Sequence, residues 1–273
     1  MNENKKKSGL ISLNTSYFFR GIAIIMVIFS HYFEWGKFSI GNEKLTDFVA
    51  TWGDYGVGIF LFLSGYALYK GYGSTKTDKR YVLKRIKNMY LPYLLIATVT
   101  SIWAGSLENF HDVIELLYGG DFWFITVIIL IYVAFYFVGK LPEKYRVLIM
   151  TLFIIEFSLV YYIEGRNDFW YTTNWTFALG MIVSKYEYKI PFVRNGFTLD
   201  IKDYVFSFLG KLTIYIYVSH IFIYNQIINL GALESVNWWI RLFIAIAITV
   251  LVSFVLERLF SLIKIGDKTG GKL

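Results

Sequence analysis

The sequence contains no cysteine among its 273 residues, and it has only three prolines and three histidines. The absence of cysteine excludes disulfides and thiolate metal sites. The three histidines, His31, His111 and His220, are too far apart along the chain to show a metal-ligand spacing, so no metal is expected. Charged residues make up only 17% of the chain, against about a quarter in a typical soluble domain.

Apolar residues take the place of the missing charges, at 56% hydrophobic and 20% aromatic. Several apolar runs approach the ~20 residues that cross a bilayer, at roughly 17–35, 52–71, 89–105, 122–139, 146–163, 169–185, 204–230 and 238–261. These runs predict an all-α integral membrane protein, a bundle of about eight transmembrane helices. The run at 169–185 is the weakest and could be partly interfacial.

One integral domain is expected, because no long linker, soluble part or fixed-period repeat interrupts the runs. We place a single transmembrane domain at 17–261, a basic cytoplasmic tail at 1–16 and a second cytoplasmic tail at 262–273. The first run contains Arg20 and lacks a small-residue cleavage site. It is therefore expected to stay attached rather than to act as a signal peptide.

Basic residues concentrate on alternate loops, which predicts that both termini are cytoplasmic. The segment after the second run is the most basic, with Lys70, Lys76, Lys79, Arg80, Lys84, Arg85 and Lys87. The loops on the opposite side are mainly acidic. Most of the net charge of +7 is thus a topology signal, and no nucleic-acid partner is expected.

All eight tryptophans fall near the outer ends of the predicted spans, Trp123 among them. An aromatic belt at the membrane interface explains this placement. The alternative is that some of these rings form flat platforms for a sugar acceptor.

The first run carries two ionisable residues, Arg20 and His31, which are costly in lipid and so mark a candidate site. At about 100° per residue they lie within about 20° of one helix face, and about 16 Å apart along the axis. Arg20 would hold an anion near the cytoplasmic end. His31 would accept a proton nearer the outside, with Glu34 orienting its ring. The alternatives are an interface arginine and a hydrogen-bonded interface histidine.

Five segments in order resemble motifs of the acyltransferase-3 family of multi-pass membrane acyltransferases. They are FRGIAIIMVIFSHYF, GDYGVGIFLFLSGYAL, KRIKNMYLPY, FWFI and KLTIYIYVSHIFI. The resemblance covers most of the chain between about 16 and 260. Two departures are Asn88, where an arginine is common, and Leu91, where a proline is frequent. The chain also lacks two of the roughly ten spans usual in that family.

The resemblance implies transfer of an acyl group, commonly acetyl from cytoplasmic acetyl-CoA, to hydroxyls of cell-envelope carbohydrates. It implies that His31 is essential and that Arg20 belongs to the same site. The expected partners are the lipid bilayer and a polysaccharide or glycolipid acceptor. Short loops and positive-inside bias favour a bacterial plasma membrane.

Several further residues are candidates. The basic side chains of Arg80, Lys84, Arg85 and Lys87 would pair with coenzyme A phosphates, although positive-inside bias explains them equally. Ser64 and Gly65 would form a narrow passage for the pantetheine arm, or simply a close helix contact.

Two more ionisable residues lie within apolar runs. Glu156 is expected to be buried and to meet a polar group on another helix. His220 either forms a hydrogen bond that fixes helix packing or belongs to the same site as Arg20 and His31.

The predicted mechanism brings acetyl-CoA from the cytoplasm and the acceptor from outside, with His31 as general base. Direct transfer and a transient acyl-histidine both fit the sequence. The rival hypotheses are a transporter or flippase using Arg20, His31, Glu156 and His220, and a catalytically inactive family member. The acceptor and the oligomeric state stay undetermined.

Overall fold

The structure is a computed structural model that describes residues 9–36, 42–74, 80–119, 122–228 and 235–269. Side chains at 35–36, 72–74, 80–81, 228 and 263–269 lie outside the described part. The described residues are almost entirely helical, and the only β pairing among them is an isolated bridge between Ile11 and Leu199. The predicted all-α class is confirmed.

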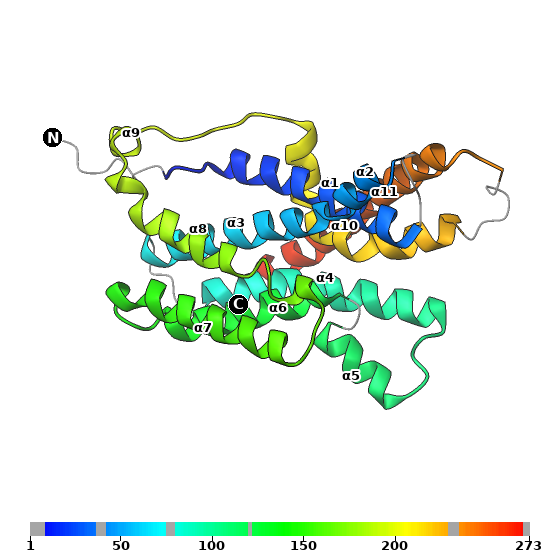
Figure 1. Ribbon diagram of the computed structural model, residues 1–273, viewed down its shortest axis with the longest axis horizontal. Helices are drawn as coiled ribbons and strands as arrows, with labels where there is room; N and C mark the ends of the chain where they lie inside the picture. Colours follow the sequence, from blue (N-terminus) through cyan, green and yellow to red (C-terminus); the bar gives the residue numbers. More distant parts are fainter. Residues whose placement is uncertain (1–8, 37–41, 75–79, 120–121, 229–234, 270–273) are drawn as a thin grey trace.

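Most of the helices are joined by short connections, whereas a long segment runs from α9 to α10 (Figure 1). They are α1 (Leu13–Gly36), α2 (Glu43–Ala50), α3 (Trp52–Ser74), α4 (Arg80–Ala104), α5 (Phe110–Tyr118), α6 (Trp123–Val138), α7 (Glu143–Ile163), α8 (Trp175–Tyr186), α9 (Pro191–Arg194), α10 (Val205–Ile228) and α11 (Trp238–Thr269). Two 3-10 turns, η1 (Asp168–Trp170) and η2 (Glu187–Lys189), flank α8.

Five helical segments of the described chain are long and apolar enough to cross a membrane. They are Leu13–Glu34, Glu43–Gly71, Glu143–Ile163, Val205–Ile227 and Trp238–Leu262. A sixth candidate is the pair α5 and α6, whose axes bend by 59° at the break between them. The chain is therefore a helical membrane protein with five or six candidate spans.

Two of the predicted spans fall short of this test. Helix α8 has 12 residues and extends about 18 Å, less than the ~30 Å hydrocarbon core. Helix α4 is long enough at 25 residues, but its first turns are basic and it contains Pro92. The count of about eight spans stays a prediction.

The centre of the fold is α1, which packs between α3 and α10, while α11 covers α10 and α8 covers α3 (Figure 1). Glycine allows α3 and α8 to approach closely. A methyl group at Gly65 would collide with the Phe177 carbonyl, and one at Gly180 would collide with the Phe62 carbonyl. This contact holds α8 against the central helices.

A buried carboxylate anchors the N-terminal segment to the end of α8. Glu187 is 1% exposed and forms an ion pair with Lys70, at 3.0 Å. It also accepts hydrogen bonds from the Tyr66 hydroxyl (2.6 Å) and the Leu10 amide (2.8 Å). The start of α1 is thereby positioned relative to α3 and α8.

Candidate active site

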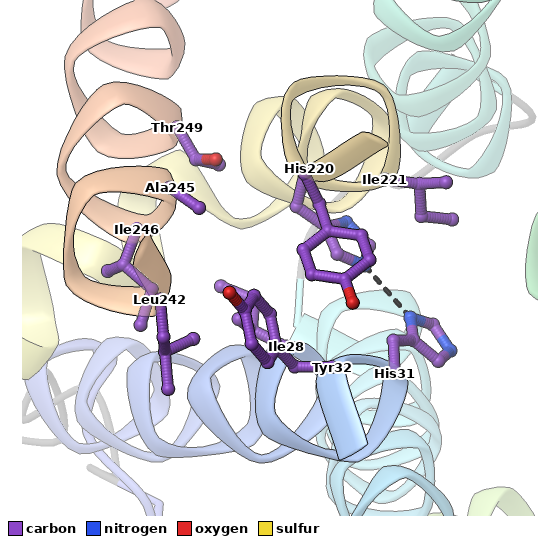
Figure 2. A pocket seen from close by; sticks show the side chains of 10 residues that line it. Ile28, His31, Tyr32, His220, Ile221, Leu242, Ala245, Ile246 and Thr249 are labelled. Carbon is purple, nitrogen blue, oxygen red and sulfur yellow. Dashed lines mark hydrogen bonds between the residues drawn. The ribbon is translucent and has the colours of Figure 1, made fainter. Parts of the chain in front are cut away.

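Two histidines from distant parts of the sequence meet where α1 crosses α10. The Nδ1 atom of His31 lies 2.8 Å from the Nε2 atom of His220, and the two ring planes differ by only 6°. Figure 2 shows His31 extending from α1 toward His220 on α10, with this contact as a dashed line. The two rings therefore form a hydrogen-bonded pair.

The surroundings of His220 determine which atoms carry protons. Its Nδ1 atom lies 3.1 Å from the carbonyl oxygen of Ile216 and 2.8 Å from that of Tyr217. Carbonyl oxygens only accept, so His220 Nδ1 carries the hydrogen and, in the neutral ring, Nε2 is an acceptor. His31 Nδ1 must then donate to it, which places the lone pair of the neutral His31 ring on its Nε2 atom. This is the tautomer that a general base requires.

The side of the histidine pair that faces α11 is tightly packed. Tyr32, Leu242 and Thr249 line the space there, which amounts to only about 10 Å³, together with the two histidines (Figure 2). That volume is barely enough for one water molecule. Substrate access to His31 is therefore from the opposite side.

On that opposite side His31 lines a cavity of about 730 Å³, which we call the outer cavity. It lies between the C-terminal ends of α1 and α10 and the N-terminal ends of α3 and α6, next to η1. Its acidic residues are Glu34, Asp54 and Asp168, and no lysine or arginine is among the described residues that line it. The cavity is suited to a polar ligand that is not anionic.

A second cavity, of about 270 Å³, opens nearer the other ends of the same helices, and we call it the inner cavity. Arg20, Arg85 and Lys211 line it, and no carboxylate is among its described lining residues. Ser64 also lines it and accepts a hydrogen bond from the Tyr132 hydroxyl at 3.1 Å. The three cationic side chains in its lining make this cavity suited to an anionic ligand.

Aromatic rings separate the two cavities. Tyr217 lines both of them, and its ring lies 6.0 Å from Phe122, in the outer cavity wall, and 5.6 Å from Phe124, in the inner cavity wall. Tyr217 is also 6.0 Å from the His220 ring. An acidic chamber and a basic chamber thus meet at one buried tyrosine beside the histidine pair.

A family model described as an acyltransferase domain, that of acyltransferase-3, matches residues 17–199. The match covers more than half of the chain and contains most of α1 and all of the helices from α2 to α9. The chain belongs to the acyltransferase-3 family. The predicted resemblance is confirmed, and the protein is a membrane acyltransferase in general type. No curated protein matches the chain, and no solved structure matches it.

Within this acyltransferase-3 protein, the predicted site residues divide between the two cavities. His31, Glu34 and Trp123 line the outer cavity. Arg20, Arg85 and Ser64 line the inner cavity, as does Asn88. Arg20 and His31, which were predicted to share one face of α1, therefore line two different cavities at two depths along this helix.

Other predicted residues lie elsewhere. Lys84 and Lys87 are exposed on α4, and the side chain of Arg80 is outside the described part. Gly65 contacts the α8 backbone and is not among the inner cavity residues.

The prediction that Glu156 is buried is wrong. Its side chain is exposed on α7, because α7 is a peripheral helix whose main contacts, with α6, α8 and η1, lie on its other face.

Sequence reasoning missed several residues of the acyltransferase-3 site. Asp54, Asp168 and Lys211 were not among the candidate residues identified from the sequence. Tyr217 lies three residues before His220, on the same helix face, and that spacing is the one signal that could have found it. Among the described residues, no group of three or more histidine, aspartate or glutamate side chains is arranged to hold a metal ion.

Proposed function

We propose that this protein is a membrane O-acyltransferase that moves acetyl from cytoplasmic acetyl-CoA to a hydroxyl of a cell-envelope carbohydrate. The observation that carries the proposal is the pair of oppositely charged cavities that meet at Tyr217. An anionic donor and a hydroxylic acceptor can then approach one transfer point from opposite ends of the helices.

The donor would enter the inner cavity. Arg20, Arg85 and Lys211 line it, and cationic side chains form charge-assisted hydrogen bonds to phosphate. The cavity is smaller than typical pockets for drug-sized ligands, which start at about 300 Å³. It therefore suits the pantetheine arm with its thioester and the pyrophosphate to which that arm is joined, while Arg80, Lys84 and Lys87 at the start of α4 would meet the nucleotide end.

The acceptor hydroxyl would bind in the outer cavity against the His31 Nε2 atom. As the hydroxyl oxygen attacks the thioester carbonyl, its proton moves to Nε2 and a carbon–oxygen bond forms. The carbon–sulfur bond then breaks, and its electron pair leaves on the coenzyme A sulfur. The proton on His31 returns to that sulfur, which restores the neutral histidine pair.

In this reaction His220 is a positioning residue, since it reaches the acceptor only through His31. Its Nε2 atom holds the His31 Nδ1 hydrogen and so keeps the lone pair on the atom that faces the outer cavity. Glu34 and Asp168 supply acceptors for further carbohydrate hydroxyls, and Trp123 supplies an aromatic surface.

The same proposal includes a topology. We place about eight membrane spans in a bacterial plasma membrane, with both termini cytoplasmic, tails at 1–16 and 262–273, and one transmembrane domain at 17–261. Because the chain has no cysteine, single substitutions such as Ser106→Cys and Lys144→Cys can be labelled cleanly from either side. An impermeant maleimide should label position 106 and not 144 in intact cells, and the reverse pattern would overturn the orientation.

The activity itself is tested with purified protein in liposomes that contain acetyl-labelled acetyl-CoA inside and a glycan fraction outside. Covalent transfer by the wild type, absent in His31→Ala, is the expected result. Equal transfer by both forms would contradict the role of His31, and no transfer by either would indicate an inactive member. Label that crosses without becoming covalent would favour a transporter. Label found on His31 itself would replace direct transfer with an acyl-histidine intermediate.

A further inference from the structure

A third cavity opens on the side of α3 and α8, and it takes the form of a groove of about 810 Å³. Its walls are mostly apolar, with Phe19 from α1, Phe62 from α3 and Leu179 from α8 among them. Trp175 and Tyr55, also in its walls, are each 58% exposed. The groove is therefore open to the membrane side of the bundle.

The groove is continuous with the outer cavity. Thr51, Asp54 and Asp168 line both. From Asp54 the groove runs along α3 to Leu63, a distance of about 14 Å at the rise of an α-helix. A molecule whose polar end lay beside His31 could thus extend an apolar chain along α3 without leaving the protein surface.

A polar atom without a partner marks the junction. The Thr173 hydroxyl, which lines the groove next to Asp168, is buried and has no hydrogen-bond partner among the described residues. The Thr173 residue as a whole is only 9% exposed. A buried hydroxyl without a hydrogen bond is unfavourable, so a ligand oxygen at this point would stabilise the site.

From these observations we propose that the acceptor is an uncharged glycolipid whose hydrocarbon chain lies in the groove between α3 and α8. This inference rests on the proposed acyl transfer and identifies its acceptor. Burial of the chain supplies affinity, Thr173 bonds an oxygen near the chain's polar end, and the sugar enters the outer cavity. Asp54 and Asp168 at the junction disfavour a phosphate there, because like charges repel.

The test uses binding, so it does not depend on catalysis. The probes are two single-chain lipids with the same photoreactive diazirine chain, one a neutral glucoside and the other an alkyl phosphate, added to the full-length protein in nanodiscs. The glucoside should label residues 55–63 and 172–179, and the phosphate should label them more weakly. Equal labelling by both probes would mean that ordinary membrane lipid merely covers the groove, and would overturn the proposal.

Variants then fill the groove. A Cβ atom at Gly58 would meet only Thr176, at 3.6 Å or more, so Gly58→Leu projects into open space. It should lower glucoside labelling about tenfold, which is the effect of displacing about two methylene groups. Leu179→Trp fills the groove from the opposite wall, and it is the variant to measure if Gly58→Leu fails to fold. Leu152→Trp, on the exposed face of α7, is the matched control and should leave labelling unchanged.

The His31→Ala form separates this proposal from the proposed function. This variant should lose acetyl transfer and keep full groove labelling, because the hydrocarbon chain of the lipid does not contact residue 31. Labelling that persists unchanged in both groove variants would refute the glycolipid site, whatever the result for transfer. Loss of transfer without loss of labelling leaves the groove assignment standing.

Discussion

The His31 Nδ1 atom and the His220 Nε2 atom lie 2.8 Å apart although the two residues are 189 positions apart in the sequence. The carbonyl groups beside His220 Nδ1 fix the direction of this hydrogen bond, with His31 as the donor. The histidine pair and the contacts elsewhere in the fold can each be tested by substitution.

The first prediction concerns His220. His220→Leu should lower kcat about 100-fold and leave the KM for acetyl-CoA unchanged, since a positioned general base contributes about 10²–10⁴-fold. His220→Gln should retain more activity, because its amide oxygen can accept the His31 hydrogen. His111→Leu is the matched control, as His111 is exposed on α5. If His220→Leu stays within twofold of wild type in kcat, the histidine pair has no catalytic role.

The second prediction concerns the inner cavity. Arg20→Gln and Lys211→Gln should each raise the KM for acetyl-CoA about tenfold, because each substitution removes one charge-assisted hydrogen bond to phosphate. Steady-state kinetics with acetyl-pantetheine, which lacks the nucleotide phosphates, should show little difference between these variants and wild type. Lys140→Gln changes an exposed lysine outside both cavities and should have no effect. An equal KM increase with both donors would indicate that the variants are misfolded, and it would contradict a role of these residues in phosphate binding.

The third prediction concerns the contact between α3 and α8. Gly65→Ala should lower the free energy of unfolding by about 1–3 kcal/mol, because the added methyl group meets a backbone carbonyl that cannot move aside easily. Gly58→Ala on the same helix should be neutral or stabilising by up to about 1 kcal/mol. Thermal unfolding in detergent gives the comparison. Similar values for the two variants would argue against close packing at Gly65.

The fourth prediction concerns Glu187. Glu187→Leu should destabilise the protein by about 3–5 kcal/mol, because it removes the buried partner of Lys70 and of two hydrogen-bond donors. Glu187→Gln keeps acceptor capacity and should cost less. Glu257→Leu on α11 changes a carboxylate that is 35% exposed and should have a much smaller effect. A smaller loss for Glu187→Leu than for Glu257→Leu, measured by denaturant unfolding, would contradict the anchor.

The fifth prediction is a pH dependence near the N-terminus. A hydrogen bond from the Ser12 hydroxyl, at 2.5 Å, holds the pKa of Asp200 below its usual range, and Asn14 and Lys202 act in the same direction. The carboxylate therefore stabilises this contact above the usual aspartate pKa of about 3.9, and the stabilisation disappears as pH falls through the lowered value. The protection factors of the amides of residues 10–15, which are corrected for the intrinsic pH dependence of exchange, should fall in acid. In Asp200→Asn these protection factors should be lower at neutral pH and should lack this acid-dependent fall.

Much of the fold was predictable because it depends on local properties. Apolar runs of sufficient length predicted helices at all eight positions, and a helix that buries apolar faces needs no distant information to form. The run 169–185 was identified as weak, and the structure gives it only the short helix α8 and the turn η1. The exposure of Glu156 was not predictable, because the exposed face of α7 depends on which helices pack against it.

The candidate site was predictable only in part, and for the same reason. The helical period places Arg20 and His31 on one face of α1, but it says nothing about the wall that divides their environments. Glu34 was expected to orient His31 because it lies one turn away. The structure puts His220 against His31 Nδ1 and leaves Glu34 in the outer cavity wall.

The sequence alone determined the all-helical class, the membrane character, the family and the placement of Arg20 and His31 on one face of the first helix, because composition, periodicity and ordered motifs are local. Only the tertiary structure decided which side chains meet. The tautomer of His31, the separation of an acidic from a basic cavity at Tyr217, and the groove between α3 and α8 each arise from helices distant in the sequence. Close packing of these helices sets the contacts, and no spacing along the chain encodes them.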